Sequence, residues 1–167
     1  LNSCAYHAGQ NGEANHGRIS RLTLDELREE LINFQLGSPK KVNILVCHHH
    51  PTLIPNVNIP DYGSIVMGES LLHFLGSGQA GRWLVVHGHI HIPNLMYAQG
   101  GMASATVLSA GSFSAHLYPE LQGFARIQFY ELDIGVKSDG LLVGKGRAWD
   151  WTPGKGWNKA TRESGLP

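Results

Sequence analysis

Two stretches of sequence, residues 42–51 (VNILVCHHHP) and 83–91 (WLVVHGHIH), decide the fold that this chain is expected to adopt. Each begins as a run of apolar residues, typical of a β-strand, and ends in a cluster of histidines. A nearly continuous apolar run indicates a strand that is buried on both faces of a mainly parallel sheet. Because parallel strands present their carboxyl ends at one rim of a sheet, we expect the two histidine clusters to meet there.

The segments around these runs predict an α/β fold. Thr23 and Glu26 have the spacing of a capping box, in which a hydroxyl and a carboxylate satisfy backbone N–H groups at a helix start. Residues 23–36 are then expected to form an amphipathic helix, because four apolar residues recur at helical spacing: Leu24, Leu27, Leu31 and Phe34. A short helix at 65–75 connects the two apolar runs. A strand, a crossover helix and a second strand predict a parallel pair.

The second half of the chain is expected to be antiparallel. Residues 104–109 and 124–132 alternate in polarity as strands do. Residues 137–140 (KSDG) are a turn signal ahead of a further strand. We expect these strands to form a hairpin that completes a second sheet. The domain is taken as residues 1–148, followed by a C-terminal tail, 149–167, that is rich in Trp, Lys and Gly.

Composition excludes several classes of protein. The chain has 167 residues, of which 42% are hydrophobic and 16% charged, with a formal net charge of zero. This balance fits one globular domain and argues against a nucleic-acid partner, although basic residues interleave with tryptophans in the tail. No apolar run approaches the about 18 residues that span a bilayer. The two cysteines, Cys4 and Cys47, do not make a disulfide framework, so a reducing, cytoplasmic setting is expected.

The first histidine cluster predicts a metal ligand. Imidazole is the commonest metal-binding side chain near neutral pH. His48 directly follows the apolar run and is expected to point over the rim as a ligand. His49 is expected near the substrate, as the catalytic residue. His50 precedes Pro51, which favours an extended conformation, and is expected to be structural.

The second cluster predicts two more ligands. On a continued strand, His89 and His91 would share a face at a spacing of about 6.6 Å. Two metals in a bridged site lie roughly 3.5–4 Å apart, so each histidine could serve a different ion. Gly88 is expected where the backbone turns tightly or approaches the ions closely.

Together these motifs resemble the C-terminal half of the calcineurin-like metallophosphoesterases. That family has a strand ending in a ligand histidine and, some tens of residues later, Gly-His-x-His. The first matches at His48 and the second at residues 88–91, while residues 109–112 (SAGS) resemble a short Gly-Ser turn of many members. The resemblance covers roughly residues 1–135.

The resemblance implies a four-layer α-β-β-α sandwich with mixed sheets and a dinuclear centre at the strand ends. His89 would bind one metal with His48, and His91 would bind the other. The implied cofactors are divalent ions such as Mn, Fe or Zn, two per complete site. The implied activity is hydrolysis of a phosphomonoester or phosphodiester, in which the ions activate water and stabilise the attacking and leaving oxygens.

The upstream motifs of that family are absent from this chain. Asp-x-His, Gly-Asp-x-x-Asp and Gly-Asn-His-Asp/Glu find no match among its aspartates, which are Asp25, Asp61, Asp133, Asp139 and Asp150. The site is therefore expected to need an N-terminal half, in cis or from another chain, and the isolated chain to have little or no activity. The alternative is a non-enzymatic, degenerate module used for partner binding or scaffolding. A half-built sheet would expose apolar edges, which also favours a homo-oligomer.

Overall fold

The computed structural model describes residues 1–5, 16–36, 41–54, 64–99, 101, 103–117, 119–121 and 123–160. The first part of this chain contains α1 (Arg21–Gln35), β1 (Asn43–Val46), α2 (Gly68–Gly76) and β2 (Trp83–His87). The second part contains β3 (Asn94–Tyr97), β4 (Thr106–Ser109), the short 3-10 helix η2 (Pro119–Leu121), β5 (Gln128–Val136), β6 (Leu142–Thr152) and β7 (Gly156–Lys159). The fold is mixed α/β, as expected.

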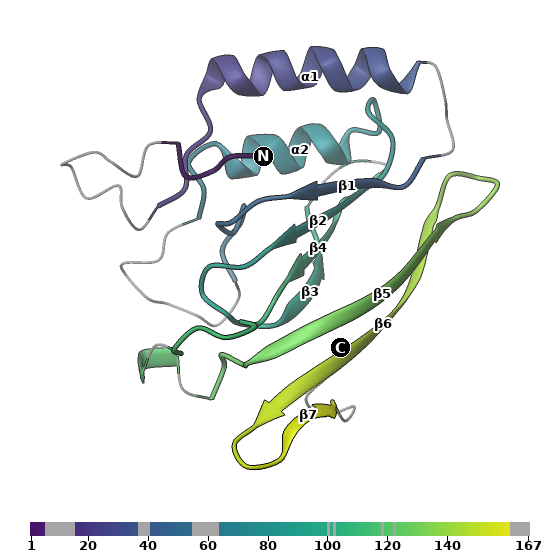
Figure 1. Cartoon of the computed structure of the whole chain (residues 1–167). Coiled ribbons are helices and arrows are strands. Elements are labelled where there is room, and N and C mark those ends of the chain that lie inside the picture. The colour runs from purple at the N-terminus through teal and green to yellow at the C-terminus, as the bar shows by residue number, and fades with distance from the viewer. Residues whose placement is uncertain are drawn as a thin grey trace.

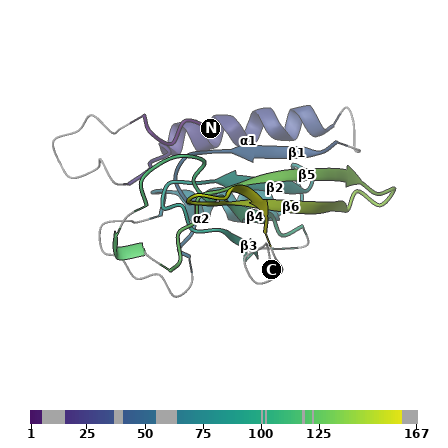
Figure 2. The same ribbon diagram turned by 60° about the horizontal axis from the view of Figure 1, so that its bottom comes forward.

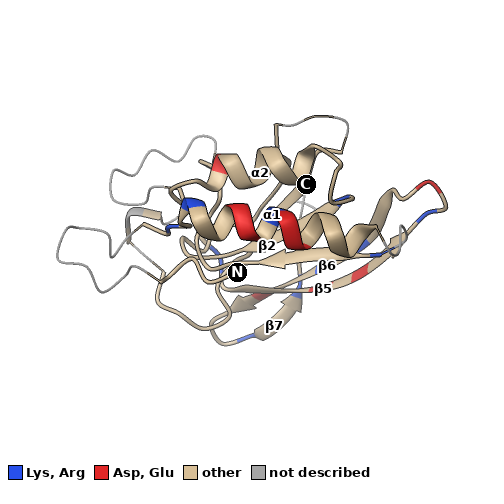
Figure 3. Ribbon diagram, turned by 90° about the horizontal axis from the view of Figure 1, so that it is seen from above, with Lys and Arg blue, Asp and Glu red and all other residues tan. Residues whose placement is uncertain are grey.

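The elements stack in three layers. Both α-helices cover one face of a four-stranded sheet, and a three-stranded sheet lies on its other side (Figure 1). The main core fills the space between the helices and the first sheet, and it includes Leu24, Leu75 and Val85. Acidic and basic residues lie along α1 (Figure 3), where Arg28 pairs with Asp25 on the exposed surface. The fourth layer of the expected sandwich is not among the elements that the structure describes.

The first sheet has the order β1-β2-β4-β3. β1 and β2 are parallel, which confirms the expected strand, helix and strand unit. β4 corresponds to the strand expected at 104–109, and it pairs parallel with β2 and antiparallel with β3. The expectation that it belongs to a second sheet was therefore wrong. Alternating polarity reports which face of a strand is buried and does not specify which strand it pairs with.

β1 departs from the expected burial. Leu45 packs into the core, but the side chains of Ile44 and Val46 are 48% and 60% exposed. The expectation of a strand buried on both faces was therefore wrong, because the structure covers only the helix-facing side of this edge strand. Its other side presents apolar residues to solvent, which is unusual for a sheet edge.

The helices form where expected, with different starting points. α1 begins at Arg21 because the hydroxyl of Ser20 accepts a 3.0 Å bond from Thr23 N, so Ser20 is the N-cap in place of Thr23. Leu24 is fully buried, whereas Phe34 is 58% exposed and lies under the ammonium of Lys41. α2 begins at Gly68, later than expected. Its inward residues are the predicted ones: Leu71, Leu72 and Leu75.

The second sheet has the order β5-β6-β7. The predicted hairpin turn connects β5 to β6, which pair antiparallel along their length. β6 and β7 contain Trp149, Trp151 and Trp157, so the boundary expected after residue 148 falls within a strand. Phe129 stacks on Trp149 with ring centroids 6.0 Å apart, and Trp151 meets Trp157 at 5.5 Å. Residues 149–159 are therefore a structured part of this sheet, and residues 161–167 lie outside the described chain.

The contrast between two leucines of α1 tests the core. Leu24 is fully buried, and Leu22, two residues away, is 69% exposed. We expect Leu24→Ala to lower the free energy of unfolding by about 2–5 kcal/mol, since truncation leaves a cavity under the helix. Leu22→Ala should change it by less than about 0.5 kcal/mol. Urea unfolding followed by circular dichroism measures both, and equal effects would contradict this packing.

Candidate metal centre

Hydrogen bonds between the ends of β1 and β2 bring the two histidine clusters together. Parallel pairing continues beyond the strands, because Cys47 N donates to Val86 O at 3.1 Å and Gly88 N donates to His48 O at 3.1 Å. The chain segments that carry His48 and His89 are thus held side by side. The expectation that both clusters reach one rim of the sheet is confirmed.

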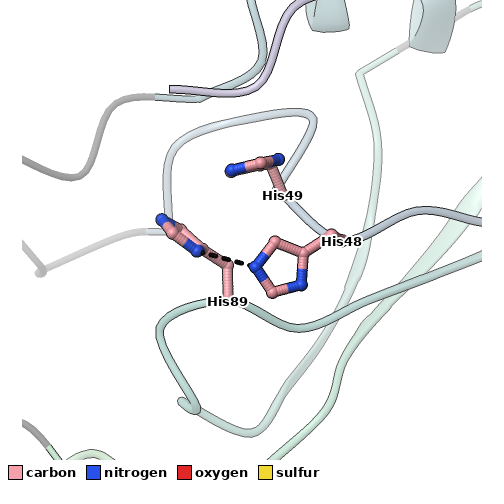
Figure 4. A group of neighbouring side chains, drawn as sticks. All are labelled: His48, His49 and His89. Carbon is pink, nitrogen blue, oxygen red and sulfur yellow. Dashed lines mark hydrogen bonds between the residues drawn. The ribbon is translucent and has the colours of Figure 1, made fainter. Parts of the chain in front are cut away.

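Three imidazoles converge at this rim. His48, His49 and His89 each offer a ring nitrogen within 4.8 Å of the others, an arrangement that could hold a metal ion. His48 Nε2 and His89 Nδ1 are 3.1 Å apart (Figure 4). The ring of His49 lies 4.4 Å from that of His89, centroid to centroid. The predicted ligands His48 and His89 are therefore neighbours, and His49 joins them.

The residues after β2 form a turn, not a continued strand. Ile90 N donates to Gly88 O at 3.1 Å, and the φ angle of His89 between them is 75°. An i to i+2 bond around a residue with positive φ is a rare and strained γ-turn. His91 also has a positive φ, of 59°. The expectation that His89 and His91 share a strand face was wrong, because β2 ends at His87 and both histidines lie in the turn that follows.

His91 lies outside the group of three imidazoles. Partial burial and the nearby His48 lower the pKa of His91 below its ordinary value. Its backbone carbonyl accepts a 2.9 Å bond from Arg126 N, which connects this turn to the residues before β5. The assignment of His91 to a second ion remains a prediction.

Buried isoleucines hold the strained turn in place. Ile90 and Ile92 alternate with the two histidines and are almost fully buried. They pack in a second small core with Ile54, Leu121 and Ala125. Burial of two such side chains is worth roughly 3–6 kcal/mol, and two residues held at an unfavourable φ together cost about 2–6 kcal/mol. The anchors can therefore offset the strain at His89 and His91.

The structure bears on one of the two reasons expected for Gly88, the tight turn, and leaves close approach to the ions as a prediction. The φ of Gly88 is not positive, and a Cβ at this position would meet no atom of the described chain within 4 Å. Neither turn geometry nor packing within the protein therefore requires glycine here. Open space remains beside the backbone between His87 and His89.

A second layer of histidines lies behind the group. His50 and His87 are both buried, with ring centroids 6.2 Å apart. Burial lowers the pKa of His87 to about 4, so the ring is neutral at pH 7. Sequence reasoning assigned His87 no role. The sequence could have indicated that His87 is buried, because period-two alternation places it on the same face as Trp83 and Val85, which point into the core.

No protein-family model, curated protein or solved structure matches this chain.

The helices of the described chain include none with the length and apolar character needed to cross a bilayer. An all-imidazole donor set suits Zn, Fe, Cu or Ni, while carboxylates suit harder ions such as Mn. In the described chain, the group of three contains no carboxylate.

The burial of His87 predicts acid sensitivity. An unfolded histidine has a pKa of about 6.5, well above the value of about 4 in the folded protein. The unfolded state therefore binds more protons as pH falls below 6.5, so stability is complete above that pH and declines down to about pH 4. In the presence of EDTA, the free energy of unfolding should fall between pH 7 and pH 4.5 in both proteins. The fall should be about 2–3 kcal/mol smaller in His87→Gln than in the wild type.

The matched control for this experiment is His73→Gln. His73 is an exposed histidine of α2, away from the buried pair, so the same substitution there controls for the loss of an imidazole as such. Urea titrations at the two pH values measure the free energies of unfolding. Identical pH dependence in the wild type and His87→Gln would show that this ring is not the acid-sensitive group.

Proposed function

We propose that this chain supplies the histidine half of a metal centre that hydrolyses a phosphomonoester or phosphodiester. The observation that carries the proposal is the convergence of His48, His49 and His89 at the ends of two parallel strands. The resemblance of the two motifs to the calcineurin-like metallophosphoesterases supports the reaction class. Divalent ions at such a centre polarise the phosphoryl group and activate water.

The three imidazoles fit a divalent ion but do not complete a dinuclear site. Neutral imidazoles contribute no charge, whereas two divalent ions bring four positive charges that carboxylates usually balance. In the resembled family, carboxylates come from the upstream motifs. The proposal therefore includes an N-terminal half, in cis or from another chain, that adds carboxylate ligands.

Open surfaces of both sheets support such a partner. β1 lies at an edge of the first sheet and β5 at an edge of the second, on the same side of the molecule (Figure 2). Beside them, the face of β1 that carries Ile44 and Val46 is exposed. A gap of about 200 Å³ between the sheets is lined mainly by apolar residues, among them Leu84, Leu108 and Ile134. Added strands could pair with both edges, and helices of the same half could cover the second sheet as the fourth layer of the sandwich.

His49 fits the role of a ligand better than that of a group facing substrate. Its side chain is fully buried, while His48 is exposed. A buried ring can reach an ion held between its neighbours, but it is shielded from a bulky phosphoester. Within the proposal, His49 is therefore the third ligand of the ion bound by His48 and His89.

Scaffolding remains the second candidate function. It is favoured by the absence of carboxylates from the histidine group in the described chain. The two candidates differ in one respect, since an enzyme needs the metal for turnover and a scaffold does not. Metal binding and activity therefore separate them.

Metal binding tests the centre directly. His89→Ala removes one of the three ligands and should weaken binding of Zn²⁺ or Mn²⁺ by about tenfold or more. Removal of a residue that only orients a ligand already weakens metal binding by about that factor. His73→Ala, on the exposed surface of α2, is the matched control and should bind as the wild type does. Isothermal titration calorimetry measures both. Equal affinity in all three proteins would contradict a site at His89.

Turnover tests the reaction. The isolated chain, loaded with Mn²⁺, should hydrolyse an aryl phosphodiester at or near the background rate, because the carboxylate ligands are missing. When the upstream half is supplied, activity should appear and should be lost in His89→Ala. Full activity of the purified chain alone would contradict the need for a second half. Metal binding without activity in the completed protein would favour the scaffold.

A further inference from the structure

We propose that Ser3 is a positioning residue that sets the orientation and tautomer of His49, an inference that rests on the proposed metal centre. Ser3 Oγ lies 3.0 Å from His49 Nδ1, and the backbone N–H of His49 donates to the same oxygen at 3.3 Å. Both side chains are almost completely buried, Ser3 at 1% and His49 at 0% exposure. A single hydroxyl thus contacts the backbone and the ring of one residue.

Gly17 supports the ring from another direction. A Cβ at Gly17 would lie 2.7 Å from Cβ, Cγ and Nδ1 of His49, so the glycine backbone packs directly against this side chain. Gly17 is itself held in place, because its carbonyl accepts a 2.8 Å bond from Val66 N. Arg18 N donates to Ser3 O at 3.1 Å, which joins the two supporting segments. Ser3 and Gly17 therefore both lie against the Nδ1 side of the imidazole.

The Ser3 hydroxyl can either donate to Nδ1 of His49 or accept from it, and the proposed metal centre favours the second arrangement. A serine oxygen has two acceptor lone pairs, so Ser3 Oγ can accept from the backbone N–H of His49 and from Nδ1–H together. The ring then carries its proton on Nδ1, and Nε2 is the nitrogen that we assign to the metal ion. Ligand histidines commonly donate their second ring N–H to a fixed partner, which orients the ring and increases its basicity. Ser3 supplies that partner here.

Cys4 provides a control for this assignment. Its Sγ lies 3.9 Å from the same Nδ1 atom, at the long limit of a sulfur hydrogen bond. A thiol at this distance contributes little orientation compared with a hydroxyl at 3.0 Å. If Ser3 is the positioning group, Cys4→Ala should leave His49 unchanged.

The experiment measures tautomer and affinity separately. In the metal-free protein, long-range ¹H–¹⁵N NMR should show His49 protonated at Nδ1 in the wild type and in Cys4→Ala, and a mixture of tautomers in Ser3→Ala. By calorimetry, Ser3→Ala should bind Zn²⁺ about 10–100-fold more weakly than either, although no metal ligand has been removed. Circular dichroism confirms that each variant is folded.

Two results would overturn the proposal. One is a wild-type His49 that carries its proton on Nε2, and the other is a Ser3→Ala variant with unchanged tautomer and affinity. Failure of the wild type to bind any ion would instead remove the proposed metal centre. The NMR measurement would still decide whether Ser3 orients the ring. Gly17→Ala, whose added methyl group overlaps the ring, should also weaken Zn²⁺ binding.

Discussion

Parallel pairing between β1 and β2 is the interaction on which the candidate site depends. The bond from Cys47 N to Val86 O and the bond from Gly88 N to His48 O extend this pairing past the strands. They place residues 41 positions apart in the sequence close enough for His48 Nε2 and His89 Nδ1 to lie at 3.1 Å. Without this pairing the imidazoles would be separate surface groups. The core beneath α1 and α2 stabilises the sheet and therefore the site.

A strained turn completes the geometry. His89 and His91 both have positive φ angles, which non-glycine residues adopt rarely. Such outliers persist only where the surroundings compensate for them, and they cluster at functional sites. Here the compensation comes from Ile90 and Ile92, which are buried next to the two histidines. The alternation of histidine and isoleucine thus separates two roles, because the isoleucines anchor the turn while His89 joins the group of three imidazoles.

The proposed metal centre and the first sheet share one feature of the described chain, which is an open side. The three imidazoles bring no negative charge to an ion, and the exposed apolar face of β1 has no covering layer in the described chain. Added strands that carry carboxylates would satisfy both conditions at once. This coincidence is the reason that the proposed function includes a second segment.

The sequence by itself determined the α/β class, the parallel β1–β2 unit, the inward leucines of α2 and the meeting of His48 with His89. These features follow from local periodicity and from the rule that parallel strands end at one rim. Only the tertiary structure decided that β4 pairs with β2, that one face of β1 is open, that His49 is buried in the group and that Ser3 contacts its ring. Those features depend on contacts between residues distant in the chain, such as Ser3 and His49, and a local pattern carries no information about which distant segment will meet it.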